Sequence, residues 1–245
     1  MTGTDAWDDG SREAEAGLPV DRSSGDLIPS AAFCTVPDDI RVRNPLSHRS
    51  GWLTRCYRCH LKRCLDVVFA MVALVVALPV LVLASILIKC NSRGPVLYVQ
   101  HRLGRDGQRF QVLKLRTMTD RLRTAHVQVF DGDPEVTRVG HFLRRTKIDE
   151  LPQLWNVIRG DMSIVGPRPG LPEHLKTYDE RGLHRLLVRP GLTGLAQVHG
   201  NIHLSWPHRW LYDAWYVDHL APGLDAWIVL RTVAVVWRGE QHYAP

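Results

Sequence analysis

The sequence predicts a mostly helical α+β fold for a monotopic membrane protein, with a Pro-broken re-entrant helix, a small β-hairpin and interfacial amphipathic helices. Three observations lead to this fold class. An uncharged apolar run extends from Val67 to Ile88 and contains Pro79. Apolar and polar residues alternate on both sides of a Gly-rich turn at residues 104–107. Helix-period patterns recur in the C-terminal half of the chain.

Composition divides the chain into an acidic tail and a basic domain. Of 245 residues, 31 are Lys or Arg and 25 are Asp or Glu, for a net charge of +6. Residues 1–50 carry 9 acidic and 5 basic side chains without an apolar period, which predicts a disordered acidic N-terminal tail. Residues 51–245 form the predicted membrane-associated domain, and their net charge of +10 favours anionic partners. This composition excludes collagen, a disulfide scaffold and a wholly disordered chain.

The apolar run is long enough to enter a membrane. A straight helix over it would extend about 33 Å, close to a bilayer core of about 30 Å. Pro79 lies near the middle of the run, where its missing N–H and its ring break or kink a helix. Basic residues flank both ends, so the positive-inside rule places both in the cytoplasm. We therefore predict a re-entrant helix over about residues 65–89, with a kinked spanning helix and a buried core helix as alternatives.

The elements that follow are predicted from local patterns. The alternating segments around residues 104–107 predict a two-stranded hairpin. Residues 120–135 lack such a pattern and are expected to form a mobile loop. Helices are expected near Thr146 and at 173–187, 206–219 and 224–237. An apolar stripe along the last of these fits either an interfacial helix or an ordinary core helix.

The densest group of chemically active residues lies between Gly140 and Pro169. Thr146 and Asp149 match the S/T-x-x-D/E pattern that begins many helices, which places Asp149 and Glu150 in a first helical turn. An adjacent Asp-Glu pair there can bind a divalent metal, attack phosphorus as a carboxylate nucleophile, or simply cap the helix. The pair alone leaves these three roles open.

Basic residues around this pair favour a phosphorylated substrate. Arg144 and Arg145 precede the pair, and two prolines flank Arg168 in a Gly-Pro-Arg-Pro loop. Arg189 lies in an Arg-Pro-Gly turn, and Lys114 lies in the second half of the expected hairpin. Arginine matches the geometry of phosphate oxygens, and a proline-flanked arginine loses little freedom on binding. These five residues are therefore predicted to bind phosphate or substrate, which indicates phosphoryl transfer on a substrate that carries a diphosphate.

Five blocks of sequence carry a family resemblance over about residues 60–240. They are KRCLDVVFA, LPVLVLASILIK, SRGPVLYVQHRLGRDGQRFQVLKLRTM, TRVGHFLRRTKIDELPQLWNVIRGDMSIVGPRP and VRPGLTGLAQVHG. With these blocks in this order, the chain resembles the bacterial sugar transferases, which are monotopic polyprenyl-phosphate phosphoglycosyl transferases. Only the acidic tail lies outside the resemblance.

The resemblance implies a reaction and a set of roles. Sugar-1-phosphate would pass from a nucleotide diphosphate sugar, usually UDP-linked, to a polyprenyl phosphate such as undecaprenyl phosphate, with release of UMP. Asp149 would be the nucleophile that forms an aspartyl phosphosugar, and Glu150 a metal partner or proton carrier. Mg²⁺ would be the metal, held by these two carboxylates. Arg144 and Arg168 would hold phosphate oxygens.

The resemblance also implies a location and partners. The reaction would take place at the cytoplasmic face of the bacterial inner membrane and would begin a lipid-linked polysaccharide such as an exopolysaccharide. Membrane lipid, a homodimer and downstream glycosyltransferases are the implied partners. Many relatives have Gly-Arg-Asn after the last block, whereas this chain has Gly200-Asn201-Ile202, so the donor sugar does not follow by analogy.

Two other functions were weighed against an enzyme. A catalytically silent membrane scaffold would keep the fold and recruit glycosyltransferases through the acidic tail, but retention of the dyad with Arg144 and Arg168 disfavours it. Nucleic-acid binding rests on the basic charge alone, and the apolar run disfavours it.

The five cysteines are assigned no ligand role. Their uneven spacing, without an N-terminal signal peptide, favours free thiols in a reducing compartment. Cys56, Cys59 and His60 match the CxxCH haem-attachment pattern, and Cys64 adds a fourth zinc-type ligand. The motif lies in a basic flank of cytoplasmic type and its spacing is atypical for zinc, which disfavours both ligands.

Overall fold

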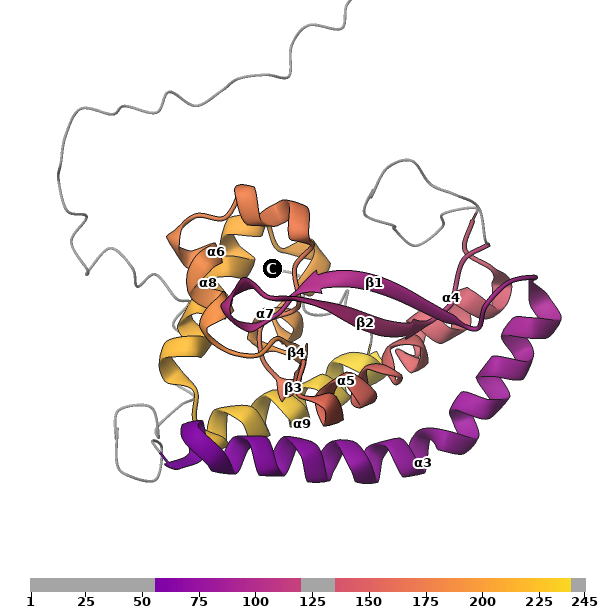
Figure 1. Cartoon of the computed structure of the whole chain (residues 1–245), viewed down its shortest axis with the longest axis horizontal. Coiled ribbons are helices and arrows are strands. Elements are labelled where there is room, and N and C mark those ends of the chain that lie inside the picture. Colours follow the sequence, from indigo (N-terminus) through magenta and orange to yellow (C-terminus); the bar gives the residue numbers. More distant parts are fainter. Residues whose placement is uncertain (1–55, 120–134, 239–245) are drawn as a thin grey trace, which may run out of the picture. The chain divides into compact units, whose positions relative to one another are not determined.

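The described part of the chain is mostly helical and has two small two-stranded sheets (Figure 1). The computed structural model describes residues 56–119 and 135–238, which belong to one compact unit. The longer helices are α3 (Lys62–Asn91), α4 (Arg138–Arg145), α5 (Gln153–Arg159), α8 (Trp206–His219) and α9 (Pro222–Arg238). The strands are β1 (Leu97–Leu103), β2 (Arg109–Leu115), β3 (Ser163–Val165) and β4 (Gly191–Thr193). Shorter helical elements are η2 (Tyr57–Leu61), η3 (Arg105–Gly107), η4 (Ile148–Glu150), η5 (Pro172–Lys176), α6 (Glu180–His184), η6 (Arg185–Leu187), α7 (Leu195–Val198) and η7 (Asn201–His203).

Helix α3 is one continuous helix of 30 residues that passes through Pro79. Among the described helices it alone is long and apolar enough to cross a membrane, judged by length and composition, and 17% of its most apolar window is buried. Figure 1 shows that α3 bends within its length. A bend is the expected result of an interior proline, which lacks an N–H and crowds the preceding turn. The structure therefore replaces the predicted break with a bend, and entry into a membrane stays a prediction.

The predicted hairpin is confirmed. Strands β1 and β2 pair antiparallel, with Leu97 opposite Leu115. The turn between them has positive φ angles at Asp106 (56°) and Gly107 (73°), and Asp and Gly tolerate this backbone conformation better than most residues. The hairpin places Lys114 of β2 beside the Asp-Glu dyad, as described below.

The C-terminal helices confirm two predictions and part of a third. Helix α8 covers the predicted 206–219, and α9 includes the predicted 224–237. The helical prediction over 173–187 is confirmed only in part, because the chain forms three short helical elements there, η5, α6 and η6, and residues 177–179 lie outside them. Asp179 has an extended backbone and accepts a hydrogen bond from the Gly182 N–H at 2.7 Å, so it begins a new helix.

Helix α9 has one buried and one exposed apolar face. Leu224, Ile228 and Val235 are buried in the main core. Leu230 is 72% exposed and Trp237 is 88% exposed. Leu230 and Trp237 belong to the apolar stripe that the sequence singled out, so the core interpretation is wrong for that part of the stripe, and its interfacial location stays a prediction.

Two predicted segments lie outside the described residues. They are the acidic tail over 1–50 and residues 120–134 of the expected mobile loop. The predicted domain boundary between residues 50 and 51 also falls there, so the division of the chain stays a prediction.

The parallel pair of β3 and β4 places the Gly-Pro-Arg-Pro loop. Ser163 lies opposite Gly191, and Val165 lies opposite Thr193. A Cβ atom on Gly191 would lie 2.1 Å from the backbone nitrogen of Gly166, so a side chain at this position would block the close approach of the two segments. The loop that carries the arginine therefore leaves β3 along a fixed path.

Buried polar contacts anchor the N-terminal end of α3. The Asp66 carboxylate accepts a hydrogen bond from the Ser163 hydroxyl of β3 at 2.6 Å. Asp225 of α9 accepts hydrogen bonds from the Tyr57 hydroxyl and from Lys62 Nζ, each at 2.6 Å. These contacts fix the start of the apolar helix to the elements that support the candidate site.

Candidate active site

Asp149 and Glu150 lie in the short connection between α4 and α5. Thr146 ends α4, and its hydroxyl donates back to the Phe142 carbonyl oxygen at 2.8 Å. Lys147 then has a φ of 57°, a left-handed conformation that turns the chain into η4. The predicted N-capping role of Thr146 is therefore wrong, because its side chain closes the preceding helix and the dyad occupies a 3₁₀ turn instead of a first α-helical turn.

Glu150 is held by two cations from other elements. Its Oε1 atom accepts a hydrogen bond from Lys114 Nζ of β2 at 2.7 Å and another from Arg168 Nη2 at 2.8 Å. Burial alone would raise the pKa of Glu150, but the charges of Arg168 and Lys114 hold it well below its usual range. Glu150 is therefore an ionised carboxylate with a fixed orientation.

Asp149 has a different environment. Its side chain is buried, and its Oδ1 atom has no hydrogen-bond partner among the described residues. Burial and the neighbouring charge of Glu150 raise the pKa of Asp149, and the charges of Lys114 and Lys147 oppose this rise. An ionised carboxylate oxygen that lacks a partner is poorly stabilised, so it is suited to attack an electrophile or to bind a cation.

The structure brings some of the predicted basic residues to the dyad and not others. The charge of Arg144 opposes the rise in the pKa of Asp149. Arg144 Nε donates to the Thr117 hydroxyl at 2.9 Å. Arg145 is exposed at the end of α4. Arg189 Nε donates to the Gly160 carbonyl oxygen at 2.9 Å, at the end of α5. For Arg145 and Arg189, substrate binding stays a prediction.

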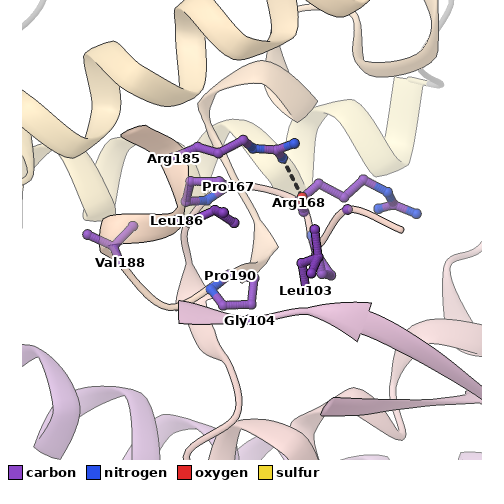
Figure 2. A pocket seen from close by; sticks show the side chains of 10 residues that line it. Leu103, Gly104, Pro167, Arg168, Arg185, Leu186, Val188 and Pro190 are labelled. Atoms are coloured by element: carbon purple, nitrogen blue, oxygen red, sulfur yellow. Dashed lines mark hydrogen bonds between the residues drawn. The ribbon is translucent and has the colours of Figure 1, made fainter. Parts of the chain in front are cut away.

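A buried ion pair between Arg185 and Asp213 supports the backbone of Arg168. Figure 2 shows the hydrogen bond from the Arg185 guanidinium to the Arg168 carbonyl oxygen. Arg185 also forms a 2.9 Å ion pair with Asp213 of α8, and both side chains are almost fully buried. Burial raises the pKa of Asp213 to about 6, which shows that the loss of hydration outweighs the favourable charge of Arg185.

Arg102 supports the same loop from the hairpin. Its Nη1 atom donates to the Pro169 carbonyl oxygen at 3.2 Å. Burial and the neighbouring charge of Arg168 lower the pKa of Arg102 to about 10. No local sequence pattern links Arg102 or Arg185 to a loop more than fifteen residues away, so a site role for them was not predictable from the sequence.

A divalent metal would fit this site only with help from the substrate. The described residues contain no group of three or more His, Cys, Asp or Glu side chains that could hold a metal ion. Asp149 Oδ1 is available as a ligand, whereas Glu150 Oε1 already accepts two hydrogen bonds from cations. Mg²⁺ commonly binds one or two carboxylates and completes its shell with substrate phosphates and water. The residues therefore fit a magnesium site that a phosphorylated substrate completes.

Comparison with known proteins identifies the family of the chain. The family model described as bacterial sugar transferase matches residues 57–239. The matched region contains the dyad, the Gly-Pro-Arg-Pro loop and all of α3. The chain belongs to the bacterial sugar transferase family.

Individual relatives of this sugar transferase differ in length. The UDP-galactose-lipid carrier transferase of Erwinia amylovora is 36% identical over 220 residues, which are 83% of this chain and 44% of that protein. The exopolysaccharide production protein ExoY of Rhizobium meliloti is 39% identical over 198 residues, 74% of this chain and 88% of that protein. The UDP-glucose:undecaprenyl-phosphate glucose-1-phosphate transferase of Caulobacter vibrioides is 47% identical over 192 residues, 74% of this chain and 72% of that protein. The chain thus spans less than half of some relatives and most of others.

Proposed function

We propose that this chain transfers sugar-1-phosphate from a UDP-sugar to undecaprenyl phosphate, with release of UMP, and so begins a lipid-linked surface polysaccharide. The observation that carries the proposal is the contrast within the dyad. Lys114 and Arg168 fix Glu150, whereas Asp149 Oδ1 is buried and has no partner in the described part of the chain. The name of the Caulobacter relative supports both substrates.

The proposed chemistry proceeds in two displacements at one phosphorus atom. An Asp149 carboxylate oxygen attacks the phosphorus that bears the sugar, the bond from that phosphorus to the UMP oxygen breaks, and UMP leaves with the electron pair. An aspartyl phosphosugar remains. An oxygen of undecaprenyl phosphate then attacks the same phosphorus, which releases the Asp149 carboxylate and forms a lipid diphosphate sugar. The covalent step lets one site accept a water-soluble donor and a lipid acceptor in turn.

The neighbouring residues bind and orient the substrates in this proposal. Arg168 donates to Glu150 through Nη2, and its side chain is 40% exposed, so its guanidinium is accessible to phosphate oxygens. The charges of Arg144 and Lys114 act on Asp149 and favour its ionised form. Bound Mg²⁺, held by Asp149 and substrate oxygens, would neutralise negative charge on the phosphates.

The test is UMP release from a panel of UDP-sugars by the purified full-length chain, with undecaprenyl phosphate and Mg²⁺. We expect release with at least one donor, and we expect it to depend on the lipid beyond a single turnover. Membranes prepared from cells without the protein are the control. A well-folded protein that releases no UMP with any donor would favour the catalytically silent scaffold or a donor with another nucleotide.

The proposal includes a membrane location for α3. Its exposed apolar side chains favour entry into the bilayer, and the basic flanks favour the cytoplasmic side for both ends. The bend seen in Figure 1 is compatible with a helix that enters and returns to the same leaflet. Such a helix would hold the dyad at the depth of the lipid phosphate on the cytoplasmic face.

Two native cysteines can test this topology. Cys64 and Cys90 are free, exposed thiols near opposite ends of α3. We compare two variants that each keep a single one of the five cysteines, either Cys64 or Cys90. We expect a membrane-impermeant maleimide to label neither variant in intact spheroplasts and to label both variants in inverted vesicles. Labelling of one of the two in intact spheroplasts would show that α3 spans the membrane. UMP release by each variant is the control for correct folding.

A further inference from the structure

Arg116 is a buried cation whose hydrogen bonds are incomplete. It follows the last residue of β2, and only 7% of the residue is exposed. Its Nη2 atom donates to the carbonyl oxygen and the hydroxyl oxygen of Ser92, each at 2.9 Å. Its Nε and Nη1 atoms have no hydrogen-bond partner among the described residues. Three of its five N–H donors are therefore unsatisfied.

A buried guanidinium with unsatisfied N–H donors destabilises the folded protein. A charged donor that is buried without a partner loses its hydrogen bonds to water, and no protein hydrogen bond replaces them. The contacts with Ser92 account for one side of the group, because they cap the last turn of α3. They leave Nε and Nη1 unexplained, and these donors match an anionic oxygen ligand such as a phosphate.

Arg116 lies close to residues that contact the dyad on one side and to the end of the apolar helix on the other. The Arg116 N–H donates to the Val96 carbonyl oxygen at 2.8 Å, so the hairpin ladder extends to this residue. Side chains two residues apart in a strand lie on one face, which places Arg116 one step beyond Lys114, the residue that binds Glu150. Thr117, the next residue, accepts the hydrogen bond of Arg144.

The other side of Arg116 adjoins the end of α3. The chain leaves α3 at Ser92, four residues after the apolar run ends at Ile88, and Arg116 binds Ser92. Ile88 of α3 and Leu115 of β2 belong to the same buried apolar cluster, so this end of the helix is packed against the strand that carries Arg116. If α3 lies in a bilayer, its end marks the depth at which a lipid phosphate would lie.

We propose that Arg116 binds a phosphate group, and that this is the phosphate of the lipid acceptor. The proposal rests on the proposed function for the identity of the acceptor. Asp149 Oδ1 and the two unsatisfied nitrogens of Arg116 are all shielded from solvent, so access to either group requires the surrounding chain to shift. The lipid phosphate would then lie between the end of the apolar helix and the dyad.

The kinetic test compares Arg116→Gln, Arg116→Lys and wild type in UMP release, with the lipid and the UDP-sugar varied in turn. We expect Arg116→Gln to raise the KM for undecaprenyl phosphate by about tenfold to a hundredfold, the loss of a charge-assisted hydrogen bond, and to leave the KM for the UDP-sugar unchanged. Arg116→Lys keeps the charge and should have a smaller effect. Arg138→Gln removes an exposed arginine at the start of α4 and is the charge-matched control.

A purely structural role makes a different prediction. Ser92→Ala removes the hydroxyl partner of Nη2 and leaves Nε and Nη1 in place, so it should lower the melting temperature without a selective effect on the lipid. If Arg116→Gln changes both KM values equally, or changes only the melting temperature, the proposal is overturned. A selective rise in the KM for the UDP-sugar would also overturn the acceptor assignment, because it would place a donor phosphate at Arg116.

A binding measurement separates this proposal from the proposed reaction. Undecaprenyl phosphate in detergent micelles should raise the melting temperature of the wild type and of Arg138→Gln, and raise that of Arg116→Gln much less. This result would support the phosphate site even if the wild type transfers no sugar. Equal shifts in all three proteins would refute it whatever the activity.

Discussion

Asp149→Asn is expected to reduce sugar-phosphate transfer by at least about a thousandfold, because an amide cannot replace a carboxylate nucleophile. Asp149 Oδ1 is buried and has no partner among the described residues, so no hydrogen bond of this oxygen has to break before it attacks. The measurement is initial UMP release with saturating donor and lipid. A second readout is retention of radiolabelled sugar phosphate on the denatured protein, which we expect in the wild type without lipid and not in the variant.

The same variant should not lose stability. Burial raises the pKa of Asp149 in the folded state, so the stability that this group contributes is present below the ordinary aspartate pKa and is lost as the pH rises through the raised value. Ionisation of Asp149 therefore destabilises the fold, and at a pH above the raised pKa a neutral amide should leave the melting temperature unchanged or higher. Asp106→Asn in the exposed hairpin turn is the matched control and should keep full activity. Wild-type activity in Asp149→Asn would exclude Asp149 as the nucleophile.

Glu150→Gln is expected to reduce both activity and stability. The amide leaves the charges of Lys114 and Arg168 without their shared carboxylate, and removing one member of a buried ion pair is strongly destabilising. Because the Arg168 side chain is 40% exposed, we expect a loss of about 2 kcal/mol, below the range for a fully buried pair. Activity should fall because Arg168 loses its fixed position. Thermal unfolding and kcat measure the two effects.

The pH dependence of this loss provides a check. The pKa of Glu150 is lowered in the folded state, so its contribution to stability is present above the ordinary glutamate pKa and disappears as the pH falls through the lowered value. The difference in melting temperature between wild type and Glu150→Gln should therefore shrink in acid. Glu180→Gln, at an exposed position of α6, is the control and should show no such difference. A pH-independent difference would mean that the ion pairs are not its cause.

Different effects of the two substitutions on stability would distinguish the two carboxylates. These adjacent carboxylates share a turn of the backbone, yet Glu150 is fixed by cations, whereas Asp149 Oδ1 has no hydrogen-bond partner within residues 56–119 and 135–238. Both substitutions should reduce activity, whereas only Glu150→Gln should reduce the melting temperature. This difference follows from their contacts and is not visible in the Asp-Glu dipeptide.

Several elements could be predicted from the sequence because their signals are local. The alternation around residues 104–107 identified the hairpin, and the helical period identified α8 and α9. The uncharged run identified α3, although its proline produces a bend instead of two pieces. Local patterns also misled at Thr146, where the capping motif is present but the hydroxyl binds the preceding helix.

The residue types needed for phosphoryl transfer could be read from the chain, and their arrangement could not. Asp149, Glu150 and the nearby arginines are apparent in the sequence, as are α3 and the hairpin, because periodicity and charge act over a few residues. Which carboxylate is paired depends on Lys114, 36 residues from Glu150, and on Arg168, 18 residues away. The supporting Arg185–Asp213 pair and the incomplete hydrogen bonds of Arg116 likewise appear only when strands, turns and helices pack together. Burial in that packing removes hydration, and the loss of hydration sets the pKa values and hydrogen-bond requirements on which the proposed chemistry depends.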